Sequence, residues 1–186
     1  RYTYDALIQK KDMIVTELKH PLPRNDDGKI SRSAVRMIAL ANVKKQNNPM
    51  NTEDFVYAHC NDTDTDIRVG TSGINHGLDR RAEVNGKEAI VIGDLIKNAV
   101  KVNEVYGNGS KQSDDYVLYS VFQEDTGTRG EKALYGVSIY VNRESNDISG
   151  YDSVDIMYSE NGKKIGTAAP SAERSYKKPL RSTVPT

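Results

Sequence analysis

The sequence has very little cysteine and no long apolar run. Its one cysteine, Cys60, excludes an internal disulfide and a zinc site built from cysteines. No apolar stretch approaches the roughly 18–20 residues that a membrane helix needs, and no signal-peptide pattern is present. We therefore expect no membrane contact, an intracellular setting, and a chain that forms part of a longer protein.

Tryptophan is absent and phenylalanine is rare, whereas the chain holds 11 tyrosines. Hydrophobic residues make up 37% of the 186 residues, which is enough to build a core. A chain of this length suits a single domain with tails. We expect that domain to have a polar surface rich in tyrosine.

The net charge is zero, but the charges are unevenly distributed. Basic and acidic side chains number 10 and 5 in residues 1–50, 10 and 19 in residues 51–159, and 6 and 2 in residues 160–186. A protein that coats nucleic acid would carry a basic excess along its whole body. Any contact with RNA is therefore expected to be local.

Several common catalytic motifs are missing. The sequence contains no GxSxG nucleophile elbow, no GxxxxGK[ST] phosphate loop and no HExxH. The three histidines, His20, His59 and His76, are scattered, so we expect neither a metal site nor a cofactor. The segment NDTDTD (61–66) starts like a calcium loop but lacks its glycine and its final glutamate, and we interpret it as a turn.

Hydrophobic periodicity predicts helices in the first half of the chain and strands in the second. Helices are expected over 34–46, capped by Ser31 or Ser33, over 73–83, capped by Ser72, and over 89–98. Asn85-Gly86 between the last two is expected to be a turn. Strands are expected over 13–18, 55–60, 67–69, 100–106, 116–123, 134–142 and 153–159.

This order predicts an α+β fold, with N-terminal helices packed on a mainly antiparallel sheet of four strands or slightly more. In the segment 134–142 one face should carry Val137, Ile139 and Val141, and the other Ser138 and Tyr140. We expect one domain over residues 1–165 and a loose C-terminal tail over 166–186.

His76 is the first candidate for chemistry, because it precedes Arg80 by four residues in a predicted helix and so shares a face with it. A histidine exchanges protons near neutral pH, and an arginine binds phosphate through two parallel hydrogen bonds. Together they provide two of the parts needed for phosphodiester transfer. A surface helix with ordinary polar residues would show the same pattern.

A second group of candidates lies in the predicted strands. Lys101 and Asn103 alternate outward from the strand over 100–106, either on a functional face or on a plainly solvated one. The polar positions of the later strands would suit an RNA cleft, but also any wetted antiparallel sheet. They are Tyr116, Ser120, Ser138, Tyr140, Asn142, Tyr158 and Ser159.

Six segments together resemble a known group of domains. They are TYDALIQKKDM (3–13), INHGLDRR (74–81), IGDLIKNAVKVNE (92–104), YVLYSVF (116–122), GVSIYVNR (136–143), and VDIMYS (154–159) with Lys163-Lys164 after it. They resemble the barnase, EndoU, colicin-nuclease and RelE-like domains of large polyvalent proteins of phages and mobile elements. HGLDRR and NAVKVNE are the specific part of the resemblance, which spans roughly residues 1–165.

The resemblance implies a metal-independent endoribonuclease or toxin effector, in which the 2′-hydroxyl attacks the adjacent phosphate. It implies His76 as acid or base, Arg80 or Arg81 on the phosphate, and Lys101 as a second cation. RNA would be bound by Asn103, Tyr116, Asn142 and Ser159. RNA, a cognate inhibitor protein and other domains of a longer parent chain are the expected partners. The expected location is the bacterial cytoplasm, reached by phage delivery or secretion.

Two other hypotheses remain open. The zero net charge and the single histidine of the motif are equally consistent with a non-catalytic binding or structural module of a polyvalent protein. A nucleotide transferase is the third hypothesis, since His-Gly also occurs in ADP-ribosyl transfer sites. The sequence shows no downstream glutamate pattern to support it.

Overall fold

The predicted α+β class is confirmed. The computed structural model describes residues 13–102, 115–160 and 163–168. Its helices are α2 (Arg32–Lys44), α3 (Thr71–Arg80), α4 (Ala82–Ile90) and α5 (Ile92–Asn98). Its strands are β1 (Thr16–Glu17), β2 (Tyr57–Cys60), β3 (Thr65–Arg68), β4 (Val100–Val102), β5 (Asp115–Asp125), β6 (Glu131–Asn142), β7 (Ile148–Glu160) and β8 (Lys163–Ala168).

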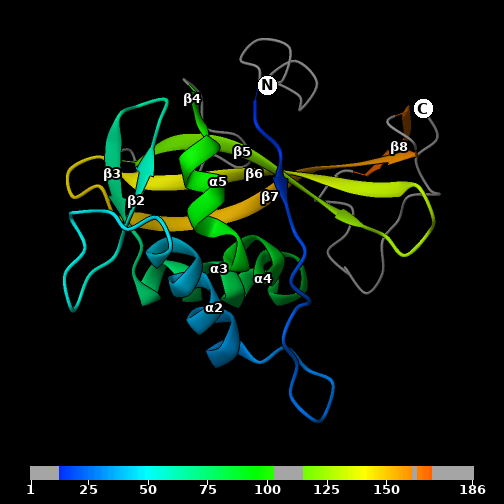
Figure 1. The fold of residues 1–186 in the computed structure, drawn as a ribbon, viewed down its shortest axis with the longest axis horizontal. Coiled ribbons are helices and arrows are strands. Elements are labelled where there is room, and N and C mark those ends of the chain that lie inside the picture. Colours follow the sequence, from blue (N-terminus) through cyan, green and yellow to red (C-terminus); the bar gives the residue numbers. More distant parts are fainter. Residues whose placement is uncertain (1–12, 103–114, 161–162, 169–186) are drawn as a thin grey trace.

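The main sheet is built around three long strands, β5, β6 and β7. Its order is β1-β5-β6-β7-β8, and β4 pairs with β5. Every pairing is antiparallel except that of β1 with β5. Helices α2, α3 and α4 lie on one side of the sheet, and the β2–β3 hairpin stands at one end (Figure 1). β8 takes in residues 163–168, part of which was expected to belong to the tail.

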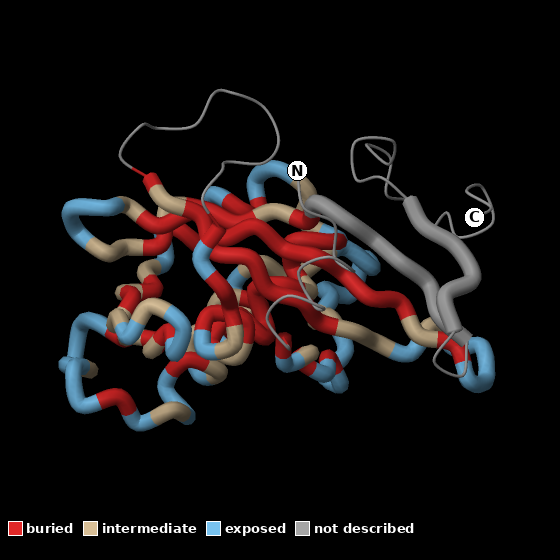
Figure 2. Tube along the Cα trace, turned by 90° about the horizontal axis from the view of Figure 1, so that it is seen from above, coloured by how far each residue is buried: buried red, intermediate tan, exposed pale blue. Residues whose placement is uncertain are grey.

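The two faces of the sheet carry different side chains, as the alternation in β6 predicted. Val137, Ile139 and Val141 join the main core with the helices, whereas Leu134 and Tyr140 join a second apolar cluster on the opposite face. Buried residues run along the long strands, and exposed ones collect in the peripheral loops (Figure 2). Ser138 and Tyr140 are therefore buried rather than wetted.

Helix α2 was predicted over residues 34–46 and runs from Arg32 to Lys44, capped by the first of the two predicted serines. Ser31 is the N-cap, and its hydroxyl accepts a hydrogen bond from the Ala34 amide at 3.4 Å. The helix buries Val35, Ala39 and Val43 against the rest of the protein. Their spacing of four residues places them in one stripe, which is what fixes the side of α2 that faces inward.

The turn predicted at Asn85-Gly86 was wrong, because both residues lie inside α4. The Asn85 side-chain amide donates to the Gly77 carbonyl at 2.8 Å, which secures α4 to α3. Gly86 packs so closely on Leu22 that a Cβ there would be 2.9 Å from Leu22 Cδ1. Tertiary contacts thus override the local turn preference of this dipeptide.

The predicted helix over 89–98 also differs from the structure. It is divided at Val91, whose φ of −120° and ψ of 20° end α4 and open α5. Ile90, Val91 and Ile92 are all buried at this bend. The continuous apolar stripe of the sequence therefore covers two short helices that meet at an angle.

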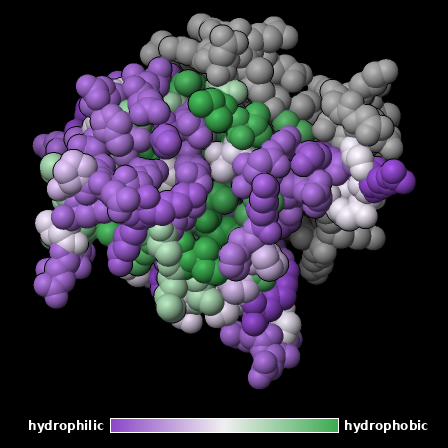
Figure 3. All heavy atoms as spheres, in the orientation of Figure 1, coloured by the Kyte–Doolittle hydropathy of each residue, from purple (hydrophilic) through white to green (hydrophobic). Residues whose placement is uncertain are grey.

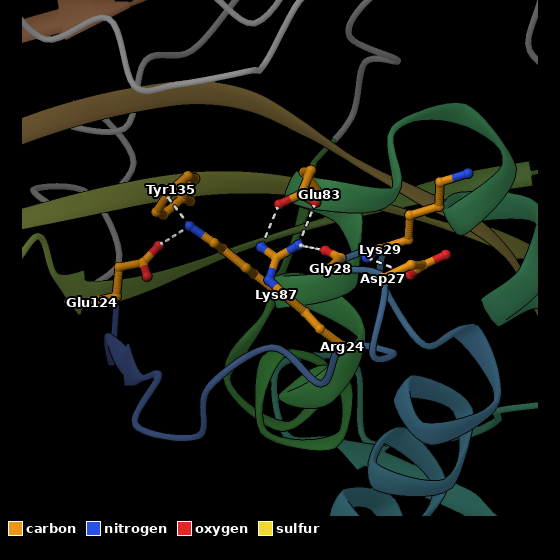
Figure 4. Close-up of polar contacts among 8 residues, drawn as sticks. All are labelled: Arg24, Asp27, Gly28, Lys29, Glu83, Lys87, Glu124 and Tyr135. Atoms are coloured by element: carbon orange, nitrogen blue, oxygen red, sulfur yellow. Dashed lines mark hydrogen bonds and ion pairs between the residues drawn. The ribbon is translucent and has the colours of Figure 1, made fainter.

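Polar contacts fasten the segment before α2 to α4, and α4 to the sheet (Figure 4). The guanidinium of Arg24 donates to both carboxylate oxygens of Glu83, at 2.9 and 2.8 Å, and this contact lowers the pKa of Glu83. Lys87 Nζ lies 2.6 Å from Glu124 Oε2 and 5.5 Å from the centre of the Tyr135 ring. These contacts fix the position of α4, against which α3 packs.

The β2–β3 hairpin carries a small charged cluster. His59 Nδ1 lies 2.9 Å from Asp66 Oδ1 and its Nε2 lies 3.1 Å from Asp64 Oδ1. The hydrogen bond with Asp66, more than the other contacts, raises the pKa of His59. Of the predicted turn over 61–66, residues 61–64 form the turn, with Asp64 at a φ of 50°, whereas Thr65 and Asp66 already belong to β3.

The face seen in Figure 1 is mostly hydrophilic, with hydrophobic side chains visible in a central strip (Figure 3). Four large apolar side chains among the described residues are exposed: Ile14, Met37, Met50 and Phe55. Ile14 precedes β1, Met37 lies on α2, and Met50 and Phe55 lie between α2 and β2, where the guanidinium of Arg68 covers the Phe55 ring at 4.5 Å. The polar surface expected from the composition is thus present on this face.

Gly77 is expected to be essential for the packing of α3 on β7. A Cβ at this position would lie 2.3 Å from Tyr151 Cζ, so Gly77→Ala should lower the free energy of unfolding by about 1–3 kcal/mol. Urea denaturation measures this difference. Gly70→Ala is the control, because no atom lies within 4 Å of a Cβ there. An equal effect of both substitutions would contradict the packing argument.

His59 should make the stability depend on pH. Its folded-state pKa is raised, so its contribution is complete below an unfolded pKa of about 6.5 and is lost as the pH rises through the folded value. The difference in unfolding free energy between wild type and His59→Gln should be largest near pH 5–6 and should decrease as the pH rises through the folded pKa of His59. Because the His59 side chain is 39% exposed, solvent screening should keep it below about 1 kcal/mol. A difference independent of pH would refute this assignment.

Candidate functional site at the edge of strand β7

Helix α3 approaches β7 through two residues without side chains. A Cβ on Gly73 would lie 2.6 Å from the Ile148 carbonyl oxygen, and Gly77 lies directly against the Tyr151 ring. The Tyr151 hydroxyl donates to the Ile74 carbonyl at 2.9 Å. This close approach sets the position of every side chain on the neighbouring face of α3.

His76 and Arg80 occupy that neighbouring face, four residues apart as predicted. Both are exposed. Position 150 of β7 is a glycine, and a Cβ there would lie 3.1 Å from His76 Cδ2. The absence of a side chain at Gly150 therefore leaves room for the imidazole at the edge of the strand.

Tyr140 lies next to this edge, because it pairs with Gly150 across β6 and β7. Burial, and then the negative charge of Asp152, raise the pKa of Tyr140, while the positive charge of Arg80 lowers it. Arg80 is thus near enough to affect the phenol, which stays protonated at neutral pH. His76, Arg80, Tyr140, Gly150 and Asp152 are together called the β7-edge site.

Arg81 has a different place from Arg80, although the two are adjacent. Its guanidinium donates to a carboxylate oxygen of Asp152 and, at 2.9 Å, to the carbonyl oxygen of Ser153. The side chains of Arg81 and Asp152 are only 17% and 20% exposed. Arg81 therefore ties the junction of α3 and α4 to β7, and Arg80 is the arginine that faces outward.

Glu88 is a buried acidic group that the sequence analysis missed. It is fully buried, and one carboxylate oxygen accepts a hydrogen bond from the Ser153 hydroxyl. Desolvation raises the pKa of Glu88 well above its usual value and so favours the neutral carboxyl. Its position directly before the apolar run 89–92 is the signal in the sequence that could have drawn attention to it.

Lys101 lies far from the β7-edge site. It sits on β4, across β5 and β6 from β7, so about three strand spacings of 4.8 Å separate the two. Its Nζ lies 5.0 Å from the centre of the Tyr116 ring, and its backbone amide donates to Asp62 at 2.9 Å. The structure thus brings two predicted residues together, Lys101 and Tyr116, but at the opposite edge of the sheet.

The remaining predicted residues do not join either group. Asn142 Oδ1 accepts hydrogen bonds from the amides of Glu144 and Ser145, both at 3.0 Å, and so shapes the turn between β6 and β7. Ser159 lies seven residues beyond Asp152 on β7, or about 23 Å along an extended strand. Asn103 is outside the described residues.

Within the ranges that the structure describes, no three His, Cys, Asp or Glu side chains are grouped so that they could hold a metal ion. Among the same residues, no helix is both long enough and apolar enough to cross a membrane. The side chains of the β7-edge site supply an imidazole, a guanidinium, a phenol hydroxyl and the Asp152 carboxylate.

The neutral state of Glu88 should be visible in the pH dependence of folding. Because its folded pKa is raised, unfolding releases a proton above about pH 4.5, and stability falls as the pH rises towards the folded value. Glu88→Gln keeps an acceptor for Ser153 but removes this fall, which is at most about 1.4 kcal/mol per pH unit for one proton. Thermal unfolding from pH 5 to 9 measures it. Parallel pH profiles for both proteins would contradict a neutral buried Glu88.

Comparisons with known proteins add no relative to these observations. No protein-family model, no curated protein and no solved structure matches the chain significantly. The assignment of a function therefore depends on the residues of the β7-edge site.

Proposed function

We propose that this chain is a metal-independent endoribonuclease whose reaction takes place at the β7-edge site. The observation that supports this most is that His76 and Arg80 lie side by side at the edge of β7. Neither forms an ion pair with a described residue. An imidazole and an unneutralised guanidinium on one exposed face suit the binding and cleavage of a phosphodiester.

The proposed reaction is transesterification within the RNA. His76 accepts the proton of the 2′-hydroxyl, whose oxygen attacks the adjacent phosphorus, and the bond to the 5′ oxygen breaks. The 5′ oxygen leaves with a proton from water, and the products end in a 2′,3′-cyclic phosphate and a 5′-hydroxyl. Arg80 stabilises the negative charge that builds up on the phosphate oxygens during the attack.

The alternative is a non-catalytic binding module. Two observations favour it: Arg81 is paired with Asp152, and Lys101 lies at the other edge of the sheet. The second cation that the ribonuclease hypothesis anticipated is therefore not beside His76. A module of this kind would bind RNA or a protein partner through the same surface without cleaving it.

Incubation of the protein with labelled RNA in EDTA tests the ribonuclease. Wild type should cleave, with 2′,3′-cyclic phosphate ends, and His76→Ala should lower the rate by about 10²–10⁴-fold as expected for a lost general base. Arg80→Gln should lower it by about 10²-fold or more through lost charge stabilisation. The cleavage rate and the end groups are both measured.

The matched control is His20→Ala, because His20 is also exposed and its hydrogen bond among the described residues is with the neighbouring Pro21 carbonyl. It should cleave like wild type. Equal cleavage by wild type and His76→Ala would rule out His76 as the base. RNA binding by all variants without cleavage by any would establish the binding module instead.

A further inference from the structure

We propose that Arg36 of α2 binds a second phosphate, so that the substrate is a single-stranded RNA running from α3 onto α2. This inference rests on the proposed function and names the substrate class of the same site. It depends on how α2 is attached to α3 and on which charges that attachment leaves without a partner.

Two arginines of α2 reach α3 at the same residue. Arg36 Nη1 donates to Asn75 Oδ1 at 3.0 Å, and Arg32 Nη2 lies 3.4 Å from the Asn75 carbonyl oxygen. Arg32 also forms an ion pair with Asp79. Asn75 immediately precedes His76, but consecutive residues of a helix point about 100° apart. Arg36 is therefore held on the side of α3 that faces α2, next to the side that carries His76 and Arg80.

The two arginines differ in charge balance. Arg32 is neutralised by Asp79, whereas Arg36 meets a neutral amide and, among the described residues, no carboxylate. An arginine has five N–H donors, so one bond to Asn75 leaves a free fork for an anion. Arg36 therefore presents a positive charge that is already oriented before a ligand arrives.

The positions match the path of one strand. From Asn75 to Arg80 the axis of α3 rises about 7.5 Å. A separation of this size along the helix is within the span of a short single-stranded segment, whose backbone can follow a row of cations. One phosphate held by Arg80 and another held by Arg36 could thus belong to the same short segment, with His76 between them.

The limited extent of the charge favours a single strand over a duplex. The chain has no net charge, and residues 51–159 carry an acidic excess. A duplex presents many phosphates in fixed positions and is bound through a broad basic surface. A flexible strand can follow a short row of cations across two helices.

The test measures the affinity of the His76→Ala protein for a labelled single-stranded hexanucleotide at several salt concentrations. Adding Arg36→Gln should weaken binding about three- to tenfold and reduce the salt slope by about 0.7, the value for one phosphate of a single strand. Arg36→Lys should keep the slope but bind more weakly, because it lacks the planar fork. Lys44→Gln, an exposed cation at the far end of the same helix, should match the parent.

The outcomes separate this inference from the proposed function, which the cleavage assay tests independently. Equal affinity and salt slope for Arg36→Gln and the parent would overturn the role of Arg36, but would not contradict the proposed ribonuclease activity. Tighter binding of a duplex than of the hexanucleotide would overturn the substrate class. Binding that depends on Arg36, in a protein that does not cleave, would support the surface and refute the enzyme.

Discussion

The contact between Gly77 of α3 and the Tyr151 ring of β7 determines most of what is distinctive in this structure. Because neither Gly73 nor Gly77 has a side chain, the backbone of α3 comes close to β7. The Tyr151 hydroxyl then reaches the Ile74 carbonyl. With one side of α3 fixed in this way, the rotation of the helix is fixed too. His76 and Arg80 must then emerge at the edge of the sheet.

The same arrangement protects an edge of the sheet. Strand β7 pairs with β8 only from Ile156 onward, so among the described strands its residues 148–155 have no partner on the outer side. An unpaired edge is a template for unwanted association. Here Arg81 binds the Ser153 carbonyl, and α3 lies along the strand. One structural solution thus shields the edge and presents a histidine and an arginine beside it.

The sequence was sufficient to predict the elements whose patterns are local. The alternation in β6 predicted the two faces of the sheet, and Ser31 was one of two predicted caps for α2, because both signals depend on neighbouring residues alone. The pairing of His76 with Arg80 followed from the helical repeat in the same way. Asn85-Gly86 was misinterpreted because its contacts with Gly77 and Leu22 are tertiary, and no local pattern contains them.

Which residues form the site could be predicted only with knowledge of the order of the strands in the sheet. Lys101 was grouped with His76 because both belong to segments of one resemblance, yet β5 and β6 separate them in the sheet. The placement of Tyr116 beside Lys101 follows from the pairing of β4 with β5, which the sequence leaves open. Residues far apart in the chain can be assigned to one site only when the sheet topology is known.

The function of each cation here depends on its partners more than on its residue type. Arg80 and Arg81 are chemically identical neighbours, but the end of α3 falls between them. One therefore points outward and the other turns back to Asp152. Arg32 and Arg36 differ in the same way, because Asp79 neutralises the charge of Arg32, whereas Arg36 is hydrogen-bonded to the neutral side-chain amide of Asn75. A protein with no net charge can thus carry, among its described residues, two arginines that no carboxylate neutralises, and these two are the cations on which the proposed RNA site depends.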